Sequence, residues 1–176
     1  EINSVVPVTN GGFYIKTQDG GGDKTHYLIN ISGEILWQDS NLSTEWDSYE
    51  AFSRYVVPYY EKDGVYHLVV MDKTGVREMI FNNLIDGGGY SYDNVHKSGF
   101  VAREEDGSIY KYWIIADGSS TPILLKEYNS GDDSVDVYQY AYSDKMLVVT
   151  NDTLYQVYDK DAQLLATLDI TTITSN

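Results

Sequence analysis

The stretch VVMDKTGV, residues 69–76, places two apolar strand ends around a short polar turn. Asp72 opens this turn, where its carboxylate can accept a hydrogen bond from the backbone N–H two residues further on. Gly75 stands three residues later, at the position where a left-handed residue completes a type I turn with a bulge. The stretch therefore predicts a β-hairpin, and the fold depends on whether the chain repeats it.

The hairpin recurs along the chain, in LINISGEILW (28–37), IIADGSSTPILL (114–125) and QVYDKDAQLL (156–165). The residues that open the four turns are all Asn or Asp and lie 42, 45 and 42 residues apart: Asn30, Asp72, Asp117 and Asp159. Gly33 repeats the glycine of the first stretch, whereas Ser120 and Ala162 replace it in the last two copies. We therefore expect the last two turns to differ in detail from the others.

A second turn precedes each hairpin, in DGGGD (19–23), KDG (62–64), EDG (105–107) and ND (151–152). Asp-Gly between strand-like runs is a strong signal for a tight hairpin. A further strand fits ahead of each of these turns, in NSVVPV (3–8), DSYEAFS (47–53), DNVHKS (93–98) and DVYQYAY (136–142). Four strands per unit, repeated four times, are typical of a β-propeller, whose blades are four-stranded sheets.

Apolar residues occupy both sides of the strands that lead into the repeated turns. In each repeat, the residue that stands two places before the turn opener is predicted to be buried: Leu28, Val70, Ile115 and Val157. A sheet that is apolar on both faces is one that its neighbours cover on both sides. The 17 tyrosines agree with an all-β chain, because aromatic residues favour strands.

We expect one domain over residues 1–176, with blades at about 1–40, 41–85, 86–128 and 129–176. The repeats could close into a four-bladed ring or form part of a larger propeller. The same hairpins could also build a β-sandwich or a barrel. Because the chain begins at Glu1 rather than Met, we expect a processed chain or an excised piece of a longer one.

The stretches VVMDKTGV and LINISGEILW resemble the repeats of bacterial WG-type and quinoprotein-like propellers. In those repeats an Asp/Asn-x-x-Gly hairpin is followed by apolar or Trp residues. The resemblance covers the third and fourth strands of each unit and implies propeller architecture alone. The cofactor-binding residues of the quinoprotein enzymes have no assignable counterparts in this sequence, so none is carried over.

The composition excludes several classes of function. Twenty-seven acidic residues against 12 basic ones give a net charge of −15, which repels nucleic acid and anionic lipid. The chain has no Cys, so it has no disulfide, no thiolate metal site and no Cys nucleophile. We predict a secreted or cell-surface bacterial protein that does not insert into membranes and is a monomer.

The longest connections join one expected blade to the next, at 38–47, 82–93 and 127–136. They and the strand that follows the second of them carry the candidate ligand-binding residues: Trp46, Tyr90, Tyr92 and His96. Exposed aromatic rings beside polar groups can stack on sugar rings or anchor a protein partner. The alternative is that these rings fold back as caps over the blades.

Each expected first strand opens with an Asn or Asp, and these residues are the candidate metal ligands: Asn3, Asp47, Asp93 and Asp136. They lie 27, 25, 24 and 23 residues before their turn openers, so equivalent positions would form a ring at a channel mouth. Rings of oxygen ligands bind hard cations, and calcium is the cofactor that this ring would hold. The alternative is that each residue only caps a turn at the start of its strand.

No nucleophile elbow, HExxH motif or Ser/His/Asp set is present to indicate catalysis. The leading hypothesis is an extracellular or cell-surface binding module that recognises a protein or glycan through its blade-connecting loops. One alternative is a glycan hydrolase or lyase that uses Asp and Tyr residues at the channel mouth. Another is a structural domain of a larger surface protein.

Overall fold

The computed structural model of the chain describes residues 1–8, 12–40, 44–45, 49–51, 54–72, 74–84, 95–96, 99–131, 133–139 and 143–173. For 44–45, 49–51, 54–62, 95–96 and 139 it describes the backbone alone. The described chain is all-β, as the sequence predicts, with antiparallel strands in four sheets and a single turn of 3-10 helix, η3 (Ile170–Thr172). Among these residues, no helix has the length and apolar character needed to cross a membrane.

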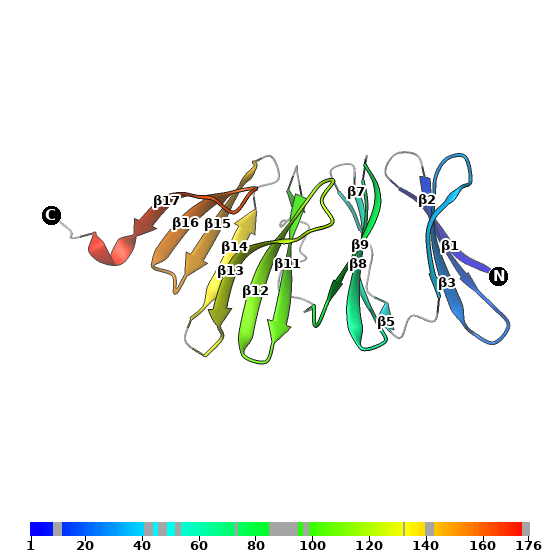
Figure 1. Cartoon of the computed structure of the whole chain (residues 1–176), viewed down its shortest axis with the longest axis horizontal. Coiled ribbons are helices and arrows are strands. Elements are labelled where there is room, and N and C mark those ends of the chain that lie inside the picture. The colour runs from blue at the N-terminus through cyan, green and yellow to red at the C-terminus, as the bar shows by residue number, and fades with distance from the viewer. Residues whose placement is uncertain are drawn as a thin grey trace. The chain divides into compact units, whose positions relative to one another are not determined.

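The chain divides into two compact units, Glu1–Asn82 and Asn83–Asn176, each with two sheets (Figure 1). The first sheet holds four strands in chain order: β1 (Ile2–Val8), β2 (Gly12–Gln18), β3 (Lys24–Ile29) and β4 (Ile35–Ser40). The second sheet follows: β5 (Thr44–Glu45), β6 (Tyr49–Ala51), β7 (Arg54–Lys62), β8 (Val65–Asp72) and β9 (Gly75–Phe81). The two short strands β5 and β6 both pair with β7, so together they take the place of one first strand.

The second unit repeats this arrangement. The third sheet holds β10 (Val95–His96), β11 (Gly99–Asp106), β12 (Ile109–Ala116) and β13 (Ile123–Asn129). The fourth sheet holds β14 (Val135–Gln139), β15 (Lys145–Thr150), β16 (Leu154–Asp159) and β17 (Leu164–Asp169). Each sheet falls inside one expected repeat or extends past its end by one residue. Each sheet connects its strands in sequence order, as a meander.

The turn openers set the hairpins through side-chain hydrogen bonds. Asn30 Oδ1 accepts from the backbone N–H groups of Ser32 at 3.0 Å and Glu34 at 2.9 Å, while Gly33 adopts a φ of +82°. Asp159 Oδ1 makes the same two bonds, to Asp161 N at 2.9 Å and Gln163 N at 2.8 Å. The expectation that this last turn differs is wrong, because Ala162 adopts the left-handed conformation of the glycine, with a φ of +57°.

The third turn lies one residue earlier than the sequence spacing predicts. Strand β12 ends at Ala116, whose carbonyl accepts from the backbone N–H of Ser119 at 3.1 Å. Gly118, with a φ of +78°, supplies the left-handed residue inside this turn. The opener is therefore Ala116 rather than Asp117, because a glycine inside the loop sets the tighter turn.

The two sheets of the first unit pack face to face. Tyr14 and Leu28 of the first sheet lie in one buried cluster with Val69 and Met71 of the second sheet. Leu28 and Val69 are completely buried.

Leu28 stands two residues before its turn opener. We name its side of the sheet the leading face, and the opposite side the trailing face. The leading face of the first sheet thus meets the trailing face of the second, because Met71 directly precedes Asp72.

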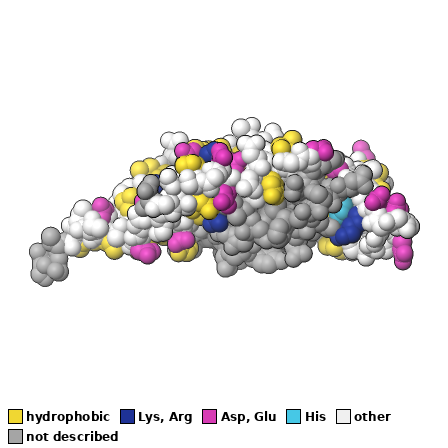
Figure 2. All heavy atoms as spheres, turned by 90° about the horizontal axis from the view of Figure 1, so that it is seen from below, with side chains coloured by type: hydrophobic (Ala, Val, Ile, Leu, Met, Phe, Trp, Pro, Cys, Tyr) yellow, Lys and Arg dark blue, Asp and Glu magenta, His cyan; other side chains and the backbone are white. Residues whose placement is uncertain are grey.

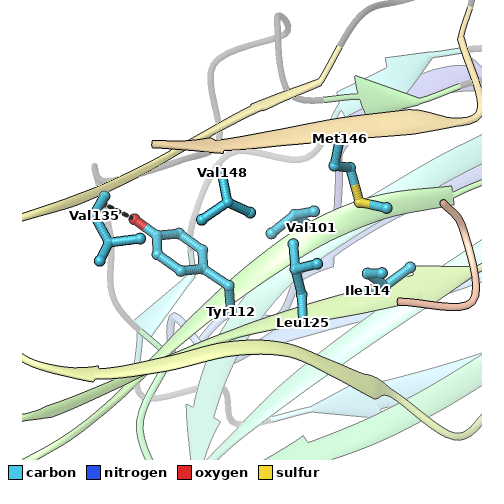
Figure 3. Packing of buried hydrophobic residues seen from close by; sticks show 7 residues of the cluster. All are labelled: Val101, Tyr112, Ile114, Leu125, Val135, Met146 and Val148. Carbon is cyan, nitrogen blue, oxygen red and sulfur yellow. Dashed lines mark hydrogen bonds between the residues drawn. The ribbon is translucent and has the colours of Figure 1, made fainter. Parts of the chain in front are cut away.

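The second unit uses the same faces. Figure 3 shows Val101, Tyr112, Ile114 and Leu125 of the third sheet pointing toward Val135, Met146 and Val148 of the fourth. Ile114 stands two residues before the corrected opener, so it lies on the leading face. Met146 pairs with Tyr158, which directly precedes Asp159 and so lies on the trailing face. Both units therefore join a leading face to a trailing face.

Three of the four predicted core positions are buried, and the corrected register moves one of them to the other face of its sheet. Leu28 and Val70 are completely buried on leading faces, as predicted. Ile115 is also buried, at 1 % exposure, but on the trailing face of its sheet because its turn starts one residue earlier. Val157 is only half-buried, because it lies on the leading face of the last sheet in the chain.

Val70→Ala and Val157→Ala form a matched pair that tests this difference in burial. We expect Val70→Ala to lower the free energy of unfolding by about 2–3 kcal/mol, because it opens a cavity at a completely buried site. Val157→Ala should cost less than about 1 kcal/mol, because water already reaches this side chain. Denaturant unfolding measures both, and equal losses in the two variants would contradict the assigned faces.

Gly33→Ala and Gly20→Ala test the turn conformation without a steric contribution. A Cβ atom at either position would meet nothing within 4 Å, but only Gly33 has a positive φ, of +82°. Gly33→Ala should therefore destabilise the protein by roughly 1 kcal/mol. Gly20→Ala should be neutral or slightly stabilising, because it only restricts the unfolded chain. Similar shifts of the denaturant midpoint in both variants would rule out this conformational origin.

Candidate functional site

Three tyrosines and one arginine gather on the leading face of the third sheet. They are Arg103 of β11, Tyr110 and Tyr112 of β12, and Tyr128 of β13. Arg103 pairs with Tyr112, and Tyr110 pairs with Tyr128 in the next row, toward the hairpin between β11 and β12. Directly paired residues of antiparallel strands project to the same side, so the four side chains share one surface. We name this set the tyrosine–arginine cluster.

The rings of the cluster are nearly parallel. Tyr110 and Tyr128 stack with ring centroids 5.3 Å apart and an interplanar angle of 21°. Tyr112 and Tyr128 stack at 6.1 Å and 15°. The guanidinium carbon of Arg103 lies 5.3 Å from the Tyr110 ring centroid, within the range of a cation–π interaction. The cluster is thus a stack of tyrosine rings with a positive charge over the ring of Tyr110.

The side chains of the cluster differ in burial from one row to the next. Tyr112 is 4 % exposed and its hydroxyl donates to the Val135 carbonyl at 3.1 Å, which fixes the inner row against the fourth sheet. Tyr110 and Tyr128, in the outer row, are half-buried. Burial, and then the neighbouring Tyr112, raise the pKa of Tyr128 to about 12, although the nearby Arg103 charge lowers it. The Tyr128 hydroxyl therefore stays protonated at neutral pH, and a hydrogen bond with Tyr112 contributes to this shift.

Buried polar atoms continue this surface across the two facing sheets. Arg103 Nε, Thr150 Oγ1 and Gln156 Oε1 are buried without a hydrogen-bond partner in the described part of the chain. Thr150 pairs with Val135, the residue that Tyr112 contacts, and Gln156 lies in the adjacent row of the same trailing face. The space between the third and fourth sheets is therefore apolar at the Met146 end and polar beside the cluster.

The connection between the third and fourth sheets lies next to the cluster. Ser130 N donates to Ser108 O at 2.9 Å, which ties the start of the connection to the β11–β12 hairpin. Asn151 holds its other end, because its Nδ2 donates to Asp133 Oδ1 at 2.7 Å and its Oδ1 accepts from Ser134 N at 2.8 Å. This segment belongs to the connection 127–136 that the sequence marks as a loop between blades. A braced loop holds the rim of the aromatic surface in place.

A second charged group, at the end of β8, has a structural role. Asp72 is 2 % exposed and its Oδ2 lies 2.8 Å from Arg77 Nη2. Its Oδ1 accepts from Thr74 N at 2.8 Å and from Thr74 Oγ1 at 2.5 Å. Burial raises the pKa of Asp72, but the hydrogen bonds from Arg77 and Thr74 outweigh it and bring the pKa to about 2. The ion pair therefore closes the turn that the repeat is built on.

The ligand-binding residues predicted from the sequence lie largely beyond the described chain. Trp46, Tyr90 and Tyr92 are outside the described residues. The backbone of His96 is described in β10, where it pairs with Gly99, but its side chain is not. Their role in binding stays a prediction.

Of the predicted calcium ring, the structure describes two members. Asn3 is exposed and its Nδ2 donates to Gln18 Oε1 at 2.9 Å. Asp136 is exposed in β14, and Asp47 and Asp93 lie outside the described residues. The described acidic and histidine residues contain no group of three or more that could hold a metal ion. The ring itself stays a prediction.

Two described histidine side chains have partners within their own sheets. His26 is 1 % exposed and its Nδ1 lies 2.5 Å from the Tyr14 hydroxyl. His67 Nδ1 lies 2.6 Å from Glu78 Oε1 across the β8–β9 pair. Both side chains therefore bind a partner on a neighbouring strand of their own sheet.

The tyrosine–arginine cluster was not predicted from the sequence. Its signal is the alternation in YKYW, residues 110–113, which places Tyr110 and Tyr112 on one face of a strand. Tyr128 joins them only through the strand register, which a bulge between Tyr112 and Trp113 shifts. No protein-family profile matches this chain, and no curated protein matches its sequence.

Asp72→Asn tests the ion pair through the pH dependence of stability. A carboxyl whose folded pKa is lowered stabilises the fold above its unfolded pKa, and this contribution disappears as pH falls toward the folded value. We therefore expect wild type to lose about 2 kcal/mol between roughly pH 4 and pH 2 from this group. Asp72→Asn should be less stable at pH 7 and lack this loss.

Asp136→Asn is the control for this experiment, because it removes an exposed carboxylate from a strand. Its acid unfolding curve should follow the wild-type curve. A variant Asp72→Asn that keeps the wild-type slope below pH 4 would show that the pair does not contribute.

Proposed function

We propose that this chain is a binding module of β-propeller type, exposed on a bacterial surface or secreted, that recognises a glycan through the loops joining its blades. A protein segment is the other class of ligand that the same surface fits. The single observation that carries the proposal is the tyrosine–arginine cluster, which lies beside the hydrogen-bonded residues Ser130, Asp133 and Ser134 of the connection.

Two features support the propeller architecture. The four sheets are four-stranded meanders, with β5 and β6 sharing one strand position. In each unit, the leading face of one sheet packs on the trailing face of the next. A repeated face-to-face contact of this polarity is the way in which propeller blades follow one another.

The chemistry of the cluster supports a sugar ligand. The half-buried rings of Tyr110 and Tyr128 place apolar ring atoms beside the Arg103 guanidinium, a combination that can contact the C–H groups and the hydroxyls of a sugar. Arg103 lies over the Tyr110 ring and adds a positive charge with several hydrogen-bond donors. Tyr and Arg are also the residue types that dominate protein-binding hot spots, which makes a protein segment the second class.

The charge distribution supports the exclusion of nucleic acid and anionic membranes as partners. The chain carries a net charge of −15. On the face drawn in Figure 2, acidic side chains are spread over the described surface rather than gathered in one patch. A phosphate backbone or an anionic lipid surface would meet repulsion over most of this surface.

Four of the described carboxylates have structural roles. Asp19, Asp159 and Asp169 accept backbone N–H bonds at turns or at a helix start. Asp72 is held by Arg77. These carboxylates are engaged in fixing local structure, whereas a glycan hydrolase needs two of them facing one scissile bond.

The test is a binding screen of the intact chain on an array of neutral and uronate-containing oligosaccharides, followed by titration of the strongest ligand. Tyr110→Ala should weaken that ligand about tenfold or more, because it removes the outer ring of the stack. Arg103→Gln should weaken it as well, through loss of the guanidinium donors.

Tyr66→Ala, which removes a half-buried tyrosine of the first unit, is the matched control and should leave the affinity unchanged. Unfolding midpoints of the variants show whether each one is folded. A ligand that binds Tyr110→Ala and Arg103→Gln as tightly as wild type would place the site elsewhere. Binding of peptides but of no oligosaccharide would show that the ligand of this surface is a protein segment and not a glycan.

A further inference from the structure

A second cationic side chain lies in the same row as Arg103 on the third sheet. Arg103 of β11 pairs with Tyr112 of β12, and Tyr112 pairs with Lys126 of β13. The three side chains therefore project to the same, leading face. Arg103 and Lys126 are both half-buried. Lys126 thus adds a second positive charge beside the tyrosine–arginine cluster.

Neither of these cations forms an ion pair with a carboxylate of the described residues. Glu105, which pairs with Tyr110 in the next row, is the carboxylate that the described part of this face carries. The backbones of Arg103 and Lys126 are two strand spacings apart, about 10 Å, and both side chains are long. The ends of the two side chains can therefore reach one anion that lies between them.

The tyrosine rings orient the Arg103 guanidinium. Its central carbon lies 5.3 Å from the ring centroid of Tyr110. Burial is the largest influence on the pKa of Tyr128 and raises it, whereas the Arg103 charge lowers it, so the guanidinium lies near the Tyr128 hydroxyl as well. A guanidinium presents its N–H groups in a planar fork, which matches the two oxygens of a carboxylate.

We propose that the glycan recognised by the tyrosine–arginine cluster carries a uronate, whose carboxylate binds Arg103 and Lys126. This inference rests on the proposed function and names the class of sugar that the same site takes. The ring of Tyr110 contacts the C–H groups of the sugar, and the two cations select the charged group at its C6 position.

The net charge of −15 opposes this ligand far less than it opposes a nucleic acid. An oligosaccharide with one uronate carries a single charge, whereas duplex DNA carries one charge for roughly every 1.7 Å of its length. Repulsion from acidic residues further away than about 8 Å is screened at physiological ionic strength. Contact with the two cations therefore outweighs the overall charge for a ligand with one uronate.

The first experiment compares each ligand with its own methyl ester. The probes are trisaccharides that end in one glucuronate or one galacturonate, titrated into the intact chain by calorimetry at pH 7, where the carboxyl is ionised. We expect the best acid to bind about tenfold or more tightly than its ester, because the ester keeps the sugar but loses the charge. Equal affinities of acid and ester would overturn the inference.

Two variants test the side chains that select the charge. Lys126→Gln should weaken the acid about fivefold or more and leave the ester unchanged, whereas Lys126→Arg should keep the preference for the acid. Glu105→Gln should strengthen binding of the acid alone, because it removes a like charge from the same face.

Lys111→Gln is the matched control. It removes the same charge from the same sheet, but Lys111 pairs with Glu104 and so lies on the opposite face. It should leave the affinities for both acid and ester unchanged. Unfolding midpoints show whether each variant is folded. An effect of Lys111→Gln equal to that of Lys126→Gln would show a general charge effect and overturn the inference.

The remaining outcomes separate this inference from the proposed function. If Tyr110→Ala weakens acid and ester alike while Lys126→Gln weakens neither, the cluster binds neutral sugars, so the inference is wrong and the proposed function stands. If wild type binds neither form, the inference is wrong, and the oligosaccharide array decides the proposed function by itself. Binding of acidic peptides but of no uronate would overturn the inference too.

Discussion

The structure depends on the packing of one sheet's leading face against the next sheet's trailing face. A four-stranded meander with apolar residues on both sides cannot be stable alone, because one face or the other would remain in water. Leu28 and Ile114, two residues before their turns, occupy equivalent positions in the two contacts. The same position thus organises both units, although the side chains around it differ.

The turns determine which residues reach these faces. Asn30, Asp72 and Asp159 each accept a hydrogen bond from the backbone N–H two residues further on. Because side chains alternate along a strand, a shift of the turn by one residue moves every apolar side chain to the other face. The pair Ile114 and Ile115 shows this consequence, since the first faces the fourth sheet and the second does not.

The meander of four-stranded sheets could be predicted from the sequence because its signals are local. Asx turns, Asp-Gly pairs and alternating apolar residues all act within a few positions of one another. The third turn could not be placed, because Asp117 and Gly118 are adjacent and each can set a turn. The exposure of Val157 could not be predicted either, because it depends on whether another sheet covers the last one.

The tyrosine–arginine cluster illustrates what sequence spacing leaves out. Strand register brings Arg103 and Tyr128 beside the tyrosines of β12. This register includes a bulge that no local sequence pattern predicts. The cluster is tied to the fold through Tyr112, whose hydroxyl binds the Val135 carbonyl of the next sheet. The contact that stabilises the unit therefore also positions the aromatic surface.

The most direct measurement of the leading-to-trailing contact is a pair of double-mutant cycles on the free energy of unfolding. Ile114→Val combined with Met146→Ala should show a coupling energy of about 0.5 kcal/mol or more, because both residues belong to the inter-sheet core (Figure 3). Ile115→Val combined with Met146→Ala should be additive within about 0.3–0.5 kcal/mol, because Ile115 lies on the other face. Coupling to Ile115 rather than Ile114 would contradict the assigned register and the packing of the sheets built on it.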